Sequence, residues 1–98
     1  LKDSAYIPNA FTPNGDGRND VIYPTSYCQF IFESFNVYNR WGQLVFNTKI
    51  EGEGWDGKLN GQPQPEGVYI YYVTGYKVDE GRVERKHTII KGNITLLR

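Results

Sequence analysis

The amino-acid sequence predicts an all-β domain, a two-sheet sandwich of about seven antiparallel strands. The first reason is composition. Aromatic residues make up 15% of the chain, eight residues are Tyr, and helix-favouring Ala occurs only at Ala5 and Ala10. The second reason is pattern: helical periodicity is hard to find, whereas short runs rich in β-branched and aromatic residues alternate with clusters of Gly, Pro, Asn and Asp.

Each apolar run between such clusters predicts one strand. In chain order the expected strands are Tyr6–Phe11, Asp20–Tyr23, Phe30–Asn39, Gln43–Asn47, Val68–Val78, Arg82–Thr88 and Ile89–Leu97. Two hairpins are expected, one turning at Arg40-Trp41-Gly42 and the other at Asp79-Glu80-Gly81. In both, Gly supplies the left-handed conformation that a short loop needs.

The strand Val68–Val78 carries apolar or aromatic groups on both faces, which is expected of a strand central to a sandwich. The Gly- and Pro-rich segment Gly52–Gly67 predicts the long crossover between the sheets, with a tight turn at Asn60-Gly61. Trp55 lies in the middle of this crossover, where we expect it to cap one end of the core.

Length and charge limit the possible functions. The 98 residues predict a single domain, 1–98. Eleven Lys and Arg balance eleven Asp and Glu, so no basic stripe favours nucleic acid as a partner. No apolar run approaches the length of a membrane span. Because the chain starts at Leu1 within ordinary polar sequence, we expect a domain excised from a larger protein.

A polar loop follows the first expected strand and offers side-chain oxygens between glycines. Its pattern N-x-D-G-x-x-D resembles the compact loop of extracellular calcium modules, and the candidate Ca²⁺ ligands are Asn14, Asp16, Asn19 and Asp20. An EF-hand is excluded, because Thr25 occupies the twelfth place, where a bidentate Glu is required. The alternative is a turn held by Asx-type hydrogen bonds without an ion.

The inventory of reactive side chains argues against an enzyme. The chain has one His, one Cys and three Ser, and nothing near His87 in the sequence forms a triad or a metal-ligand pair. Exposed aromatic residues are better candidates for a functional surface than these reactive side chains. Trp41, Trp55 and the Tyr-rich run are interpreted as a docking patch, a sugar-stacking platform or, alternatively, core packing.

Five phrases in order give the chain a family resemblance. They are Pro8 to Gly17 (PNAFTPNGDG) followed by Asn19-Asp20, Tyr38 to Gly42 (YNRWG) with Leu44-Val45-Phe46, Trp55-Asp56-Gly57, Pro65 to Tyr69 (PEGVY), and Gly92 to Arg98 (GNITLLR). Nearly end to end, the chain resembles the gliding-motility-associated C-terminal domain, the type B sorting domain of the bacterial type IX secretion system.

The resemblance implies an immunoglobulin-like β-sandwich at the carboxyl end of a large passenger protein that is secreted or displayed on the cell surface. The implied partners are the outer-membrane translocon of the type IX system, a small outer-membrane partner protein and the covalently linked upstream passenger. The alternative function is a calcium-stabilised adhesive or carbohydrate-binding module.

The resemblance does not assign docking residues, so the candidates are polar or aromatic members of the shared phrases. These recognition-face candidates are Arg40, Trp41, Trp55, Asp56 and Arg98. We hypothesise that the Asn14–Asp20 loop, Arg40 and the final strand form one recognition face. Alternatively, Arg40 has a structural role, either stacking or pairing with a carboxylate such as Asp56. A turn-stabilising role is also expected for Asp56, with a third calcium ligand as the alternative.

Overall fold

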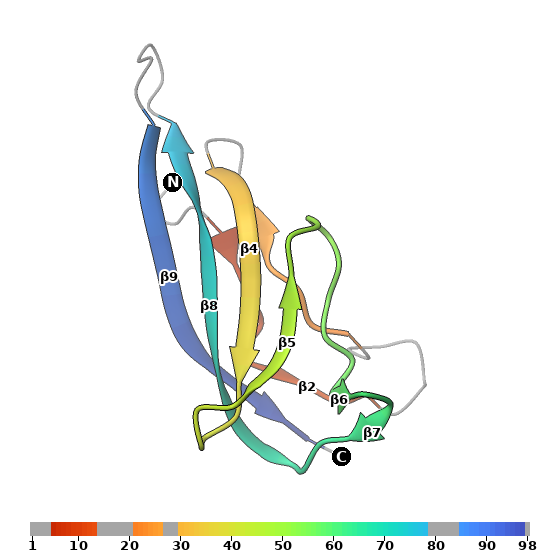
Figure 1. Cartoon of the computed structure of the whole chain (residues 1–98). Coiled ribbons are helices and arrows are strands. Elements are labelled where there is room, and N and C mark those ends of the chain that lie inside the picture. The colour runs from red at the N-terminus through yellow and green to blue at the C-terminus, as the bar shows by residue number, and fades with distance from the viewer. Residues whose placement is uncertain (1–4, 14–20, 27–29, 79–84, 98) are drawn as a thin grey trace.

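The computed structural model describes residues 5–13, 21–26, 30–78 and 85–97 of the chain (Figure 1). These residues form strands and no helix, which confirms the all-β prediction. The strands are β1 (Ala5–Tyr6), β2 (Ala10–Phe11), β3 (Thr25–Ser26), β4 (Phe30–Tyr38), β5 (Leu44–Thr48), β6 (Lys58–Leu59), β7 (Gln62–Pro63), β8 (Gly67–Val78) and β9 (Arg85–Leu96). In the described ranges, no helix is long and apolar enough to cross a membrane.

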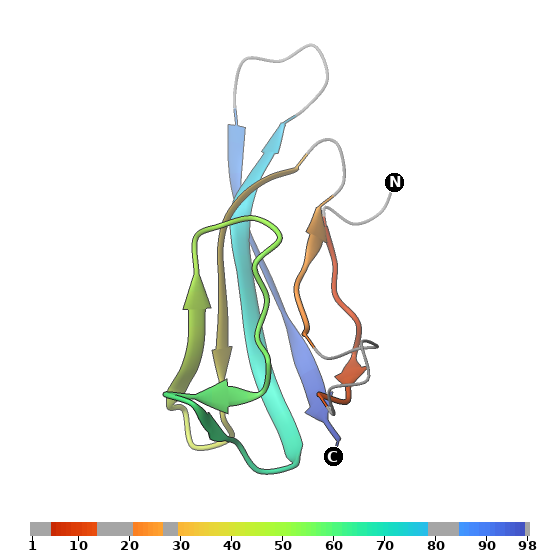
Figure 2. The same ribbon diagram turned by 90° about the vertical axis from the view of Figure 1, so that its right-hand side faces the viewer.

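One five-stranded sheet, in the order β2-β9-β8-β4-β5, forms the body of the molecule. Its pairings are antiparallel except for β2 with β9, which run parallel. The β1–β3 pair forms a second, smaller layer against one face of this sheet, as Figure 2 shows. The β6–β7 hairpin closes one end. This layered arrangement is compatible with an immunoglobulin-like sandwich.

The core lies between the main sheet and the smaller layer. Alternate residues of a strand point to opposite faces, so Tyr69 and Val73 of β8 are buried while Ile70 and Tyr72 face outward. The buried hydrophobic side chains are Phe11, Ile22, Phe30, Phe35, Val37, Val45, Trp55, Tyr69, Val73, Ile94 and Leu96. The main sheet therefore has one covered face and one outward face.

Two of the expected strands are corrected near the amino end. The expected strand 6–11 is split into β1 and β2, which belong to different sheets. Within the expected strand 20–23 the described residues make only an isolated bridge, from Ile22 to Trp55. Pro8 and Pro24 lack the amide hydrogen that a continuous ladder needs, and each lies beside one of these interruptions.

Near the carboxyl end, the structure has one strand, β9, where two strands were expected. The predicted boundary at Thr88 and Ile89 does not exist, because β9 pairs with β8 residue by residue from Arg85 to Leu96. No Gly or Pro stands at that boundary to interrupt the ladder. The predicted crossover, residues 52–67, contains the β6–β7 hairpin, and Asn60 and Gly61 make its turn with φ of 53° and 79°. The predicted turn at residues 79–81 lies outside the described residues.

Candidate recognition surface

The turn between β4 and β5 is held by the side chain of Asn39. Its Oδ1 accepts hydrogen bonds from the backbone amides of Trp41 and Gln43, both at 2.9 Å. The Asn39 amide donates to the Gln43 carbonyl at 2.9 Å, and the Gly42 amide donates to the Asn39 carbonyl at 3.0 Å. Gly42 takes a φ of 83°, which a side chain would disfavour. The predicted hairpin is confirmed, and its turn has a defined shape.

Arg40 and Trp41, called here the Arg–Trp tip, project from this turn. The Trp41 side chain is 79% exposed, and the Arg40 guanidinium carbon lies 5.0 Å from the centroid of the Trp41 ring. This geometry is a cation–π contact, which restrains both side chains. No ion pair joins Arg40 to Asp56 among the described residues, so stacking, and not a carboxylate pair, is the contact that Arg40 makes.

A small cavity of about 120 Å³ lies between the turn and the residues that lead into β8. Asn39, Arg40 and Trp41 form one wall, and residues 64–69 form the other. The second wall is held in place by the Tyr69 hydroxyl, which donates to the Pro65 carbonyl at 2.6 Å. Two shared phrases far apart in the sequence, 38–42 and 65–69, therefore meet at this cavity.

The same end of the molecule carries the carboxyl end of β9 (Figure 1). Val68, which lines the cavity, pairs with Thr95, and Gly67 pairs with Leu96. Gly67 and Val68 thus belong both to the cavity wall opposite the Arg–Trp tip and to the ladder that joins β8 to β9. The hypothesis of a single recognition face stays a prediction, because the loop 14–20 lies outside the described residues.

Trp55 and Asp56 have structural environments. Trp55 is 0% exposed and packs against Tyr69 and Phe11 at ring-centroid distances of 4.9 and 5.5 Å. Its indole nitrogen donates to the Lys58 carbonyl at 2.9 Å. It therefore lies in the core, as the cap that was expected, and offers no surface to a partner. Asp56 is exposed, and its Oδ1 accepts from the Lys58 amide at 3.1 Å, a turn-stabilising contact.

The remaining predicted residues, Asn14, Asp16, Asn19, Asp20 and Arg98, lie outside the described residues. The calcium site therefore stays a prediction. Within the described ranges, no group of three or more His, Cys, Asp or Glu side chains is placed to hold a metal ion.

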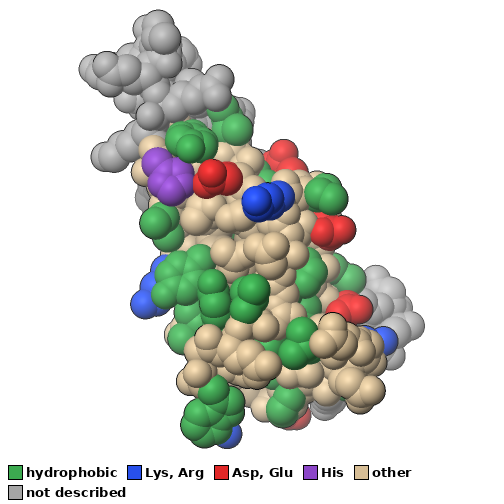
Figure 3. Space-filling model, viewed as in Figure 1, with side chains coloured by type: hydrophobic (Ala, Val, Ile, Leu, Met, Phe, Trp, Pro, Cys, Tyr) green, Lys and Arg blue, Asp and Glu red, His purple; other side chains and the backbone are tan. Residues whose placement is uncertain are grey.

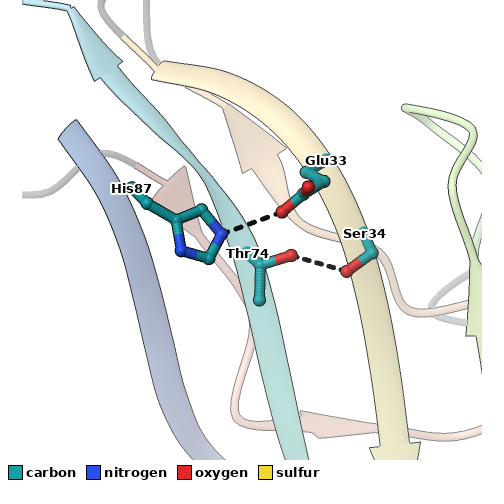
Figure 4. Close-up of polar contacts among 4 residues, drawn as sticks. All are labelled: Glu33, Ser34, Thr74 and His87. Carbon is teal, nitrogen blue, oxygen red and sulfur yellow. Dashed lines mark hydrogen bonds and ion pairs between the residues drawn. The ribbon is translucent and has the colours of Figure 1, made fainter. Parts of the chain in front are cut away.

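A polar cluster on the outward face joins three strands across the sheet. His87 of β9 reaches over β8 to Glu33 of β4, with His87 Nε2 and Glu33 Oε1 2.9 Å apart (Figure 4). Beside them, the hydroxyls of Ser34 and Thr74 lie 2.6 Å apart. The hydrogen bond to His87 lowers the pKa of the Glu33 carboxyl, and Thr74 adds to this effect.

The extra residue of a β-bulge makes this contact possible. Phe32 pairs with Gly75 and Ser34 pairs with Thr74, so Glu33 has no partner of its own on β8. A bulge re-aims the side chain at the extra position. The sequence alone did not reveal the cluster, because a bulge changes the alternation from which face assignments are made.

A protein-family model described as CHU_C Type IX secretion signal domain matches residues 5–95. The chain belongs to this family. This secretion signal domain acts as a sorting signal of the type IX secretion system and implies export to the cell surface or the medium. No curated protein and no solved structure matches it.

In this secretion signal domain, the sequence predicts Arg40 and Trp41 as candidates for recognition but does not predict the second wall of the cavity. Pro65 to Tyr69 was noted only as a shared phrase. Its contact with the turn depends on where β4 and β8 end relative to each other, which the register of two distant strands sets. Both segments, 38–42 and 65–69, belong to the family resemblance, and this was the signal that could have suggested that they lie side by side.

Proposed function

We propose that the type IX secretion machinery recognises this domain through the Arg–Trp tip and the adjacent cavity. The observation that carries the proposal is a Trp side chain that is 79% exposed yet restrained by a stacked Arg on a hydrogen-bonded turn. Trp and Arg are the residues that most often dominate binding energy at protein interfaces. A turn with a defined shape also loses less conformational entropy on binding than a floppy segment.

The same proposal includes the position of the domain in its protein and the partners of the domain. The passenger is covalently linked upstream, with this domain at its carboxyl end, and the partners are the outer-membrane translocon and a small outer-membrane protein. The domain has no catalytic function of its own, in keeping with a family of secretion signals.

The test is secretion of an inert fluorescent passenger fused to residues 1–98 in a host with type IX machinery. We expect Trp41→Ala to lower secretion roughly tenfold, the scale of losing one interface anchor. Its melting temperature should stay within about 2 °C of the parent, because the side chain is exposed. Ile50→Ala is the matched control, since Ile50 is 64% exposed and lies outside the cavity. Normal secretion of the Trp41→Ala fusion, or a loss that merely follows reduced stability, would refute the proposal.

A further inference from the structure

The outward face of the main sheet contains a second, larger hollow. Its volume is about 560 Å³, within the range of typical ligand sites. Three neighbouring strands supply its lining, since Tyr38 pairs with Ile70 and Thr74 pairs with Ile89. We call this surface the outer hollow, and its lining includes Asn36, Tyr38, Arg40, Ile70, Tyr72 and Ile89. Figure 3 shows apolar side chains gathered on this face.

The aromatic geometry of the outer hollow favours an inserted side chain over a sugar. The rings of Tyr38 and Tyr72 are edge to face, 5.7 Å apart with planes at 89°. Two perpendicular rings form a corner, whereas sugar stacking needs a flat exposed ring. Ile70 stands beside this corner and Ile89, 60% exposed, stands at its border. A corner with aliphatic walls suits a bulky apolar side chain.

Two cationic side chains lie at the outer hollow. Arg40 lines it, and Lys91 Nζ lies 5.7 Å from the centroid of the Tyr72 ring. No Asp or Glu is among the described lining residues. The acidic Glu33 on the same face is hydrogen-bonded to His87 and does not line the outer hollow. Charge complementarity therefore selects an anionic partner.

We propose that the outer hollow binds an extended acidic segment of a partner protein. A bulky apolar side chain of the segment enters the corner between Tyr38 and Tyr72, and flanking carboxylates meet Arg40 and Lys91. Arg40 belongs to both the Arg–Trp tip and the outer hollow, so the two surfaces are continuous. The assignment of the acidic segment to the secretion machinery rests on the proposed function. Binding of an acidic segment to the outer hollow does not depend on that function.

The test is NMR of the 98-residue chain with labelled Ile methyl groups. The probe is a synthetic peptide with a single Trp flanked on each side by two Glu, and the matched peptide carries Lys in place of Glu. We expect the acidic peptide to shift the Ile70 and Ile89 methyl signals in a saturable way, with the Ile50 signal unmoved. No shift with the acidic peptide, or equal shifts with both peptides, would overturn the proposal. Equal shifts with a neutral oligosaccharide, or self-association of the chain through this face, would do the same.

Variants separate this proposal from the previous one. We expect Lys91→Glu to weaken binding of the acidic peptide about three- to tenfold at low salt, the effect of reversing one exposed charge. Lys58→Glu is the control, since Lys58 is exposed on β6 and does not line the outer hollow. Lys91→Arg keeps the positive charge and should bind the acidic peptide about as well as the parent. If Lys91→Glu binds the acidic peptide normally while Trp41→Ala still lowers secretion, only the outer-hollow proposal fails. If the Trp41→Ala fusion is secreted normally while the acidic peptide binds to the parent chain, only the proposed function fails.

Discussion

At the scale of single residues, Asn39 determines the shape of the turn that presents the Arg–Trp tip. Asn39→Ala removes the acceptor used by two backbone amides, and we expect a loss of about 1–2 kcal/mol in the free energy of unfolding. Thermal unfolding followed by circular dichroism checks this. Asn39→Asp keeps the acceptor and should retain most of the stability. Equal melting temperatures for Asn39→Ala and the parent would contradict the assigned role.

The Glu33–His87 contact predicts a pH dependence of stability. The pKa of Glu33 in the folded chain lies below its ordinary value of 4.5, so the carboxylate is favoured by folding. Its contribution is present above the ordinary pKa and is lost as the pH falls through the lowered value. Melting temperatures of the parent and Glu33→Gln should therefore differ at pH 6 and converge toward about pH 3. Because both side chains are about half exposed, the difference is small. A gap that widens on acidification would exclude this origin.

At the scale of elements, the close approach of β4 to β8 depends on Gly75. A Cβ added at Gly75 would collide with the Ile31 carbonyl oxygen and the Phe30 ring. At Gly92 the three atoms nearest to the added Cβ would all belong to the Tyr71 side chain, 2.5–2.8 Å away. A ring can shift more easily than backbone, so Gly75→Ala should destabilise by about 1–3 kcal/mol and Gly92→Ala by less. Urea unfolding measures both. Equal losses would show that the backbone contact at Gly75 is not limiting.

Strands that end at glycine-containing turns were predictable from sequence, whereas the two-residue strands were not, and the long strand β9 was divided in two. In β4, β5 and β8, alternation over many residues and glycine-containing turns gave ends close to those observed. Strands β1 and β2 have two residues each, and their positions depend on partners far away, such as Thr95 and Leu96 for β2. Local patterns carry no information about such partners.

The candidate site shows the same division. Arg40 and Trp41 were found because polar and aromatic residues at a glycine turn are conspicuous in a sequence. Trp55 is conspicuous for the same reason, yet its 0% exposure comes from the bridge to Ile22 and the packing of the Tyr69 ring against it. The outer hollow was missed because Ile70 and Tyr72 were interpreted only as apolar residues on one face of a central strand, whereas the described second layer covers the other face of the main sheet.

At the scale of the whole molecule, the domain is elongated, with extents of 45 × 28 × 21 Å. The Arg–Trp tip and the β6–β7 hairpin lie at one end of the long axis (Figure 1). The Glu33–His87 contact lies on the outward face near the start of β4 (Figure 4), whereas the Arg–Trp tip follows the end of β4. One face of the main sheet holds the structure together, and the other is left to present side chains to a partner.

The parallel pairing of β2 with β9 has a consequence for biosynthesis. Ala10 and Phe11 pair with Thr95 and Leu96, and the Leu97 amide donates to the Phe11 carbonyl at 3.0 Å. A ribosome makes β2 early and β9 late, so this closing contact forms only after translation has passed Leu97. A polypeptide that ends before Thr95 therefore cannot form the β2–β9 pairing that completes the main sheet of this secretion signal domain.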